Sequence, residues 1–324
     1  MDATFEELEQ EVILRGHNRR TYAAYIVLSS LIAVGMGISV YLLMWSDSLY
    51  VQIGNAIFFS FVLMQAGLLG HDLSHRQVFV SQKINNVVGS VVWGLVCGLS
   101  KEGWYVKHNA HHSHVNHINL DPDLAIPFTF SPAQKGTSSP FVARFILPQQ
   151  HILFFVLLPF VYPSVVWESF QHAFKERNAQ SVIDVFLVAI HFFIFLSLPF
   201  IFLPPLVAFV FLFVTLVCVG FYMGMAFAPN HKGEEIKEMS KKMVWYDQII
   251  LTRNLLPSKV SFYVFGGLGY QVEHHLFPAT SRFQYPHIQP LVKAYCLRYA
   301  IPYHETTWFG SMQEIYYALK MNRK

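Results

Sequence analysis

Charged residues are scarce in this chain of 324 residues: Asp, Glu, Lys and Arg make up 13% of it, whereas 53% is hydrophobic. A soluble domain usually carries about 25% charged residues. The shortage argues against an ordinary water-soluble protein and indicates that lipid forms part of the solvent. The net charge of +3 is small and the cations form no long basic run, so the sequence also argues against a nucleic-acid partner.

Cysteine is nearly absent as well. The three cysteines, Cys97, Cys218 and Cys296, have neither a pairing pattern nor a metal-type spacing. This argues against a cysteine-based zinc site and a disulfide framework, and we expect reduced thiols that pack in the interior. Internal repeats, low-complexity tracts and long linkers are also missing from the sequence. The simplest organisation is therefore a single membrane domain over residues 1–324.

Long apolar runs, by contrast, are plentiful. A membrane-spanning helix needs about 20 apolar residues, and four nearly uncharged segments qualify: 22–45, 50–70, 182–203 and 205–228. Residues 1–21 are acidic and then basic, which predicts a short amphipathic N-terminal helix in the cytosol. They contain no small-residue cleavage site after an apolar core, so we do not expect a removable signal peptide.

Two further apolar stretches are ambiguous because they are short and interrupted. Residues 84–100 contain three glycines, and residues 151–166 contain Pro159 and Pro163. If only one of them crossed the membrane, the first and last histidine motifs would face opposite sides. If both crossed, the middle motif would be isolated. We therefore interpret both as interfacial or re-entrant, which assigns residues 71–181 and 229–324 to a cytosolic cap.

The basic residues favour the same topology. With four spans, the outer loops are only residues 46–49 and 203–205, so all 23 Lys and Arg lie on the other side or at its boundary. The positive-inside rule then places both termini and every histidine motif in the cytoplasm. Some of the cations are expected to face anionic lipid headgroups.

Histidine is the residue that this apolar chain concentrates. The motif HDLSH carries His71 and His75, and APNHKG carries His231. HNAHH places histidines three and four residues apart, a spacing that puts side chains on one face of a helix, and QVEHH repeats the spacing with a glutamine at the first position. The members of these two motifs are Gln271, His108, His111, His112, His274 and His275. Surface histidines at helix ends would not explain the repeated face-sharing, so we predict a shared metal site.

The type of ligand narrows the choice of metal ion. Structural zinc needs four ligands and commonly uses cysteine, whereas calcium and magnesium prefer oxygen. Imidazole suits iron, copper, zinc and nickel. Eight imidazoles exceed the needs of one metal ion and fit two. Two neighbouring redox metals suit oxygen activation, so di-iron is the leading interpretation, and ligand chemistry alone leaves di-zinc open.

In this order, HDLSH, HNAHH and QVEHHLFP resemble the three histidine boxes of the membrane-bound fatty-acid desaturases. The resemblance extends to GWYVKHNAHH, to NHINLDPD and to NHK after the last span, and it covers roughly residues 50–297. The glutamine at the first position of QVEHH is typical of front-end desaturases. Some bacterial desaturases that act at mid-chain also carry it, so it does not fix the position of the new double bond.

The resemblance implies an all-α integral membrane fold: four transmembrane helices with interfacial or re-entrant helices, and a cytosolic cap that holds a di-metal site. It also implies a non-haem di-iron centre and a narrow tunnel for the acyl chain. The positions that match family ligands are His71, His75, His108, His111, His112, His231, His274 and His275. Gln271 occupies the variable position near a metal, and Asn230 is a candidate for reaching an iron through water.

The implied reaction is the oxygen-dependent desaturation of an acyl chain. Two electrons and dioxygen remove two hydrogens from adjacent methylenes, a carbon–carbon double bond forms, and both oxygen atoms leave as water. Methylene hydrogens are neither acidic nor displaceable, so a cofactor must start the reaction. The motifs also lack cysteine, which such chemistry would oxidise.

Two alternatives stay open. A related acetylenase or hydroxylase would use the same boxes, with a different placement of the substrate. A membrane metal transporter or sensor is a different class, but transport ligands normally lie within the spans, where His191 is the only histidine.

The sequence also indicates an electron donor and a set of possible acyl carriers. Many front-end desaturases carry a fused cytochrome b5 domain with a His-Pro-Gly-Gly motif, which this sequence lacks. We therefore expect a separate electron donor, ferredoxin or cytochrome b5. The acyl group can be linked to coenzyme A, a lipid or acyl carrier protein, and Lys107, Arg144 and Arg253 are candidates for binding its phosphate or are ordinary positive-inside charges.

Supporting residues are expected around the ligands. A ligating imidazole generally donates its second N–H to a carboxylate or carbonyl, and the acidic residues beside the boxes are candidates for this role or else solvated: Asp72, Asp121, Asp123 and Glu273. Trp104, Phe227 and Tyr270 are candidates for lining the acyl tunnel, and packing between helices is the alternative. His114 does not match the spacing and is expected at the surface or outside the ligand set.

Overall fold

The computed structural model describes residues 4–124, 139–176, 178–238 and 244–321, and these are mainly helical. The chain forms two compact units. The span unit comprises residues 20–106 and 158–225, and the histidine unit comprises residues 1–19, 107–157 and 226–324. The predicted all-α class with four membrane helices is confirmed, whereas the assignment of residues to one domain stays a prediction.

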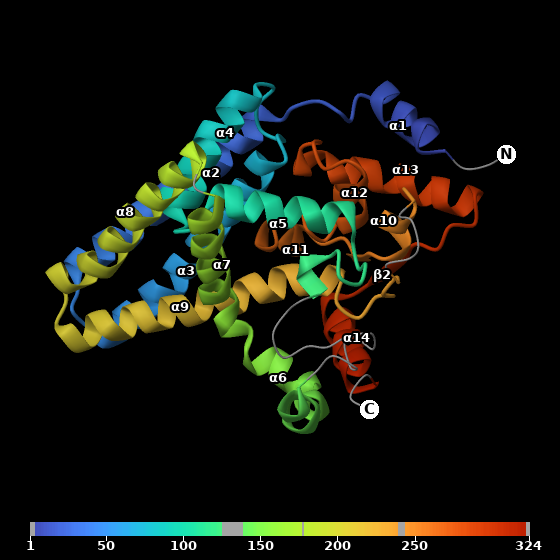
Figure 1. Cartoon of the computed structure of the whole chain (residues 1–324). Coiled ribbons are helices and arrows are strands. Elements are labelled where there is room, and N and C mark those ends of the chain that lie inside the picture. Colours follow the sequence, from blue (N-terminus) through green and yellow to red (C-terminus); the bar gives the residue numbers. More distant parts are fainter. Residues whose placement is uncertain (1–3, 125–138, 177, 239–243, 322–324) are drawn as a thin grey trace. The chain divides into compact units, whose positions relative to one another are not determined.

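Four long helices dominate the span unit (Figure 1): α2 (Tyr22–Trp45), α3 (Leu49–Ser74), α8 (Ala179–Phe202) and α9 (Pro205–Phe227). Each is long and apolar enough to cross a membrane. Among the described residues, a fifth crossing would require the bent pair Val142–Val156 and Leu158–Glu176 to act as one span.

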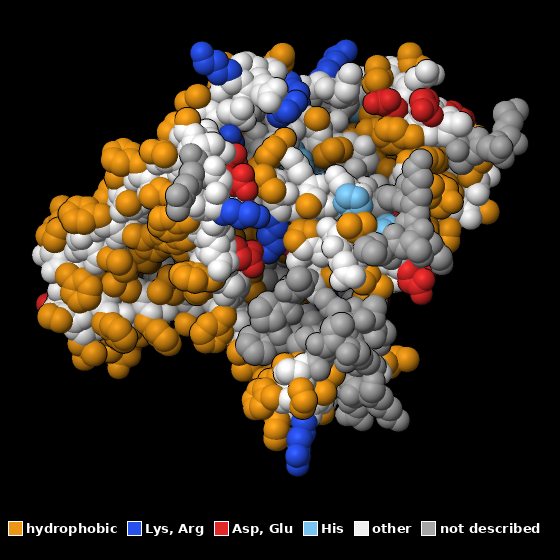
Figure 2. Space-filling model, in the orientation of Figure 1, with side chains coloured by type: hydrophobic (Ala, Val, Ile, Leu, Met, Phe, Trp, Pro, Cys, Tyr) orange, Lys and Arg blue, Asp and Glu red, His pale blue; other side chains and the backbone are white. Residues whose placement is uncertain are grey.

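The outer surface of these helices is apolar. Phe186, Phe193 and Phe200 on α8 follow one another at seven-residue intervals, and each exposes half or more of its side chain. Figure 2 shows hydrophobic side chains covering the visible surface of these long helices. A contiguous apolar surface of this kind is unfavourable in water and suits contact with lipid.

The helix bounds follow the sequence closely at three spans and differ at one. Helix α2 has the predicted limits, but α3 continues beyond residue 70 to Ser74, so that His71 lies inside the helix and His75 ends it. The last turns of α3 are buried on all sides, which explains why the helix does not stop where the uncharged run stops. The first histidine motif is therefore held by a continuous rigid helix.

Polar side chains join α2 to α3 where the two helices connect. The Gln52 amide donates to the carbonyl oxygens of Leu42 and Ser46 at 2.8 and 2.6 Å. The Asn55 amide donates to the Ser39 carbonyl oxygen at 3.1 Å and accepts from the Ser39 hydroxyl at 2.7 Å. These bonds pair the polar groups of Gln52 and Asn55 with partners on α2 and at its C-terminal end, so the polar groups are compatible with an apolar surrounding.

The two ambiguous stretches form short elements. Residues 84–100 fall mainly on α4 (Gln82–Ser90) and the π-helix η1 (Val91–Val96), which packs against α3 and α8. Residues 151–166 fall on α6 (Gln150–Val156), η6 (Leu158–Phe160) and the start of α7 (Val161–Glu176). None of these helices alone reaches the length of a span, and their depth in the bilayer stays a prediction.

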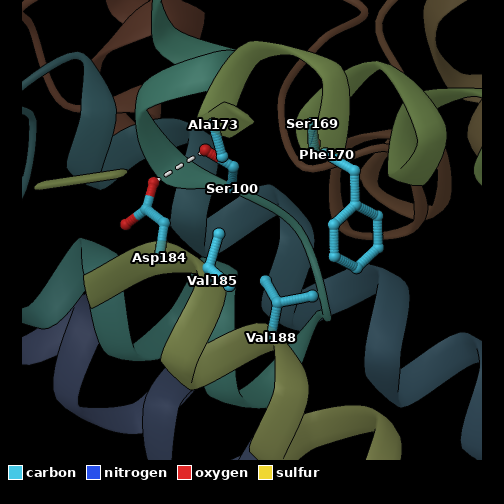
Figure 3. A pocket seen from close by; sticks show the side chains of 7 residues that line it. All are labelled: Ser100, Ser169, Phe170, Ala173, Asp184, Val185 and Val188. Atoms are coloured by element: carbon cyan, nitrogen blue, oxygen red, sulfur yellow. Dashed lines mark hydrogen bonds between the residues drawn. The ribbon is translucent and has the colours of Figure 1, made fainter. Parts of the chain in front are cut away.

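Helix α5 (Lys101–Ser113), which carries the second histidine motif, is anchored at its N-terminus by Asp184 of α8 (Figure 3). The Asp184 carboxylate accepts from the Ser100 hydroxyl at 2.7 Å and from the Glu102 backbone N–H at 2.9 Å. The Ser100 oxygen in turn accepts from the Gly103 N–H at 3.0 Å. A small cavity lies beside this network and is lined by Ser100, Ser169, Phe170, Ala173, Asp184, Val185 and Val188.

The histidine unit has a core built around α13 (Tyr285–Arg298). The N-terminal helix α1 (Phe5–Leu14) buries Leu8 and Val12 against it and turns its acidic side outward, as its amphipathic sequence predicts. Strands β1 (Arg253–Leu255) and β2 (His304–Thr306) form a two-stranded parallel sheet.

The remaining elements of the chain are short, apart from one C-terminal helix. They are η2 (Pro122–Leu124), η4 (Val142–Ile146), η5 (Leu147–Gln149), η7 (Ala228–Asn230), α10 (Asp247–Ile250), α11 (Lys259–Val264), α12 (Gln271–Leu276), η8 (Arg282–Gln284) and α14 (Trp308–Met321).

Candidate metal centre

The last two turns of α5 present three imidazoles within the histidine unit. His108 and His112 are four residues apart, and their Nε2 atoms lie 3.0 Å from each other. His274 on α12 brings its own Nε2 atom to 3.0 Å from that of His112. His108, His112 and His274 thus form one trio of rings whose Nε2 atoms face one another.

A second trio forms beside the first. His231, directly after η7, places its Nε2 atom 3.3 Å from the Nε2 atom of His111 and 3.2 Å from that of His275. The three ligand atoms lie within 4.8 Å of one another. Six histidines from three distant segments of the sequence are therefore brought together.

These spacings fit metal coordination. Nitrogen ligands bind a metal such as zinc at about 2.1 Å. Two such nitrogens are then about 3.0 Å apart at a right angle and about 3.4 Å apart at the tetrahedral angle. The four Nε2 separations, from 3.0 to 3.3 Å, fall in this interval. The nitrogen-only donor set of the two trios suits iron, copper, nickel or zinc and fits two metal ions.

The opposite nitrogens of three of the rings are held by other side chains. The His111 Nδ1 atom lies 3.0 Å from both carboxylate oxygens of Asp121. His275 Nδ1 lies 2.7 Å from the Gln248 Oε1 atom, and His274 Nδ1 lies 3.1 Å from the Tyr285 hydroxyl. A ring that donates from Nδ1 keeps the lone pair on Nε2, so these bonds orient the Nε2 atoms for metal binding.

Protonation follows from the same surroundings. Burial and the neighbouring imidazoles lower the pKa of His231 and of His275 well below the usual value, with Arg253 adding to the effect on His231. Both rings are therefore neutral near pH 7, which is the form that binds a metal. Burial alone would lower the pKa of His111, but the carboxylate of Asp121 reverses this and raises it.

The acidic residues beside the boxes differ in what they contact. Asp121 is buried against His111, in the geometry expected of a supporting carboxylate, and also accepts from the backbone N–H of Asn116 at 2.7 Å. Asp123 lies 3.6 Å from the same His111 nitrogen but is half exposed. In the span unit, an Asp72 oxygen lies 3.5 Å from His71 Nδ1.

Glu273 differs from the expectation. Its carboxylate is completely buried, but it accepts from Asn254 at 2.7 Å and from the Tyr303 hydroxyl at 2.8 Å, and it bonds to no imidazole among the described residues. Burial raises the pKa of Glu273 to about 7, although both hydrogen bonds lower it. Gln271, His274 and His275 of the same motif lie at the two trios, whereas Glu273 contacts Asn254 of β1.

Gln271 and Asn230 lie at the edge of the second trio. The Gln271 amide lies 2.9 Å from the Nε2 atom of His231 and accepts from the Asn230 amide at 3.3 Å. The Oδ1 atom of Asn230 is buried and has no hydrogen-bond partner among the described residues. Both side chains are thus close to the ligand atoms, and a water molecule bound to Asn230 Oδ1 would satisfy that oxygen.

The first histidine motif belongs to the span unit. The rings of His71 and His75 have centroids 4.7 Å apart, and Trp104 on α5 lies against both at 5.5 and 6.5 Å. Asp72 next to His71 accepts from the Tyr25 hydroxyl at 2.8 Å. The two histidines share one face of α3, as their spacing predicts.

The three tunnel candidates have ordinary packing partners. Trp104 stacks on Trp93 with centroids 4.7 Å apart, and Tyr270 is buried in the core of the histidine unit beside Phe262. Phe227 ends α9 and is half-buried. These contacts do not test the tunnel, which stays a prediction.

Sequence reasoning missed three residues that hold the trios. Gln248 also donates to the His112 carbonyl oxygen at 2.7 Å, so it joins α10 to α5 and to His275. Tyr285 lies in a different segment from any box. Asn116 donates to the carbonyl oxygens of His231 and Leu251. Only Asn116 carries a signal in the sequence, because it begins the stretch NHINLDPD after the second box; asparagine also tolerates the left-handed conformation found there.

Comparison with known proteins gives a consistent result. The family model described as fatty acid desaturase matches residues 49–307. The acyl-lipid (9-3)-desaturase of Physcomitrium patens is 29% identical over 98% of this chain and 62% of its own length. The fatty acid desaturase 3 of Homo sapiens is 29% identical over 79% of this chain and 58% of its own length.

A third relative, the delta(8)-fatty-acid desaturase of Borago officinalis, is 26% identical over 95% of this chain and 72% of its own length. The chain thus spans about three fifths of the first two relatives. The family model covers all three histidine motifs, the histidine after α9 and most of both structural units. The chain belongs to the fatty acid desaturase family.

Proposed function

We propose that the chain is an oxygen-dependent acyl desaturase whose active site holds two irons on histidine. One observation carries the proposal: six imidazoles in the histidine unit face one another through Nε2 at metal-ligand spacing, while the Nδ1 atoms of three of them are held from outside. Several relatives are named as desaturases of fatty acids or acyl lipids, which supports this activity.

His71 and His75 are proposed to complete the ligand set to eight. Helix α5 supports this step because it is continuous from Trp104, which packs against both rings, to His108 one turn later. Residues four apart share a helix face, so the face of α5 that meets the first motif is the face that carries His108.

The irons, when bound, would supply the two-electron activation of dioxygen and the removal of hydrogen from the acyl chain. The protein's own residues are proposed to hold the ligand rings in place and to orient the acyl chain. Asp121, Gln248 and Tyr285 fix the rings of three ligands from behind. Burial keeps His231 and His275 neutral. The apolar helices of the span unit are proposed to place the acyl chain, with Trp104, Phe227 and Tyr270 along its path.

Production of the chain in a host with a defined lipid pool tests the activity, with the new double bonds mapped by mass spectrometry. The wild type is expected to yield products that have lost two hydrogens. His111→Ala should abolish them, whereas His114→Ala, two residues beyond the same motif and outside both trios, should not. A product that gains oxygen would indicate a hydroxylase, and a triple bond would indicate an acetylenase; either would overturn the proposal.

Metal identity requires a separate measurement. Purified protein reconstituted without oxygen is expected to bind two Fe(II) per chain and to turn over only with iron and not with Zn(II). Metal flux into liposomes that contain the chain, without any change in acyl products, would instead support a transporter and contradict the desaturase.

The electron donor is proposed to be a separate ferredoxin or cytochrome b5, and the substrate an acyl chain on coenzyme A, a lipid or acyl carrier protein. Each donor, supplied with its reductase, should be tested with each form of the substrate. The metal site is proposed to face the cytoplasm. Labelling of single cysteines introduced at Asp47 and at Arg298 in oriented vesicles should show opposite accessibility.

A further inference from the structure

Arg253 of β1 is completely buried, and its guanidinium is hydrogen-bonded to the turn that carries His231. It donates through Nε to the carbonyl oxygen of Pro229 and through Nη2 to that of Lys232. These two carbonyls lie on either side of Asn230 and His231. A planar guanidinium has several donors in a fixed arrangement, so one side chain can fix both ends of a four-residue turn.

The charge of Arg253 is balanced separately. Its Nη1 atom lies 2.9 Å from a carboxylate oxygen of Glu234 and 2.6 Å from one of Glu314. A buried cation without such partners would be strongly destabilising. These ion pairs rule out the phosphate-binding role considered for Arg253 from the sequence, because the guanidinium is enclosed and already paired.

The next residue along β1, Asn254, is hydrogen-bonded to the third histidine motif. Its Oδ1 atom accepts from the backbone N–H of Val272 at 2.8 Å, and its amide donates to Glu273 at 2.7 Å. Helix α12 has only six residues, and its N-cap residue Tyr270 makes no capping hydrogen bond. A helix this short is not stable alone, so Asn254 supplies from another segment the cap that the motif lacks.

The geometry of a β-strand explains how two adjacent residues contact two different segments of the chain. Successive side chains of a strand point to opposite sides, so Arg253 reaches the His231 turn while Asn254 reaches α12. Pairing of β1 with β2 fixes the strand's orientation, with Arg253 opposite His304 and Asn254 opposite Glu305.

We propose that Arg253 and Asn254 are positioning residues that hold the segments bearing His231, His274 and His275 in one frame, so that retention of the metal depends on both. The inference rests on the proposed metal-binding role of these histidines. Neither residue is a ligand, and neither lies in a histidine box.

Arg253→Lys and Glu314→Gln form a matched pair. Lysine keeps a positive charge near Glu234 and Glu314 but has no planar fork for the two carbonyls. Glu314→Gln removes one ion pair of the same guanidinium and leaves the carbonyl contacts in place. If Arg253 acts only through its charge, Glu314→Gln should weaken iron retention more than Arg253→Lys does.

Asn254→Ala and Tyr303→Phe form the second pair. The alanine removes the acceptor for the Val272 N–H, whereas the phenylalanine removes a hydroxyl that contacts both Asn254 and Glu273 without touching α12's backbone. Both variants disturb the same buried network, so they differ mainly in the helix cap.

The readouts are iron per chain after purification, the rate of iron release to a chelator, and the thermal midpoint of the metal-free full chain. Loss of a group that orients metal ligands typically lowers metal affinity about 10- to 100-fold. Arg253→Lys and Asn254→Ala should release iron faster by about this factor, and Glu314→Gln and Tyr303→Phe should stay within about two-fold of the wild type.

The inference is overturned if the first two variants hold iron as the wild type does, or if iron release follows the thermal midpoint equally in all four. A folded wild-type protein that binds no metal would instead refute the proposed function, and the inference with it. Measuring the wild type first separates the two failures.

Discussion

The first and third histidine motifs reach their geometry by different routes. His71 and His75 lie at the end of α3, a helix of 26 residues whose last turns are buried, so the helix itself sets the direction of both rings. His274 and His275 lie on α12, which has six residues. Their rings are oriented by Tyr285 and Gln248. A histidine on a long helix is thus placed by local structure, and a histidine on a short one by residues elsewhere in the sequence.

The largest effect is expected from removing a ligand in either region. His71→Ala and His275→Ala should each lower desaturation by about 1,000-fold or more, because the cofactor carries the chemistry. Iron per chain should fall in both. Product analysis and metal content check this in the same preparations. If only one of the two variants lost activity, the histidine changed in the other variant would not be a metal ligand, and the eight-ligand site would be wrong.

A smaller and graded effect is expected from the side chains behind the ligands. Asp121→Asn removes a buried carboxylate at 3.0 Å from His111 and should weaken iron binding by about 10- to 100-fold. Asp72→Asn removes one at 3.5 Å from His71, on the rigid end of α3, and should weaken it by less than about 10-fold. Titration with a competing chelator measures both affinities, and the reverse order would contradict the comparison.

The same contrast explains what the sequence predicts well. Uncharged runs of about 20 residues define the four long helices, and α2 has the predicted limits. Spacing of three or four residues correctly places His108, His111 and His112 on one helix, because this rule uses only local geometry. The uncharged run ends at residue 70, but α3 continues to Ser74, and the four-residue spacing of His71 and His75 correctly places both on one face of it.

The rest of the site depends on contacts between distant segments. His112 and His274 are separated by 162 positions, yet their Nε2 atoms are 3.0 Å apart. Gln248 and Tyr285 have no unusual neighbours in the sequence, and their role appears only when α10 and α13 pack beside α12. Glu273 was expected behind an imidazole because it is adjacent to one, but on a short helix neighbouring side chains point in different directions.

A moderate loss of stability is expected where α8 holds α5. Asp184→Ala removes the acceptor for the Ser100 hydroxyl and the Glu102 N–H and should lower the free energy of unfolding by about 1–3 kcal/mol. Ser100→Ala removes two bonds, whereas Asp184→Ala removes three because the Gln180 amide also donates to Asp184, so Ser100→Ala should cost less, about 1 kcal/mol. Denaturant unfolding in detergent micelles compares them. Equal losses would mean that Asp184 adds nothing beyond its contact with Ser100.

The smallest effect is expected at one of two glycines of α3 that lie one turn apart. A Cβ atom at Gly70 would lie 2.8 Å from the Trp93 ring, whereas one at Gly67 would meet nothing within 4 Å. Gly70→Ala should therefore cost about 1–3 kcal/mol through overpacking, and Gly67→Ala should be neutral or stabilise by up to about 1 kcal/mol. Because Trp93 stacks on Trp104, which packs against His71 and His75, only Gly70→Ala should also change the environment of the first motif. Tryptophan fluorescence and unfolding of the two variants test this. A Gly70→Ala protein with wild-type stability and spectrum would show that the end of α3 adapts to its neighbours, and the contrast with α12 would fail.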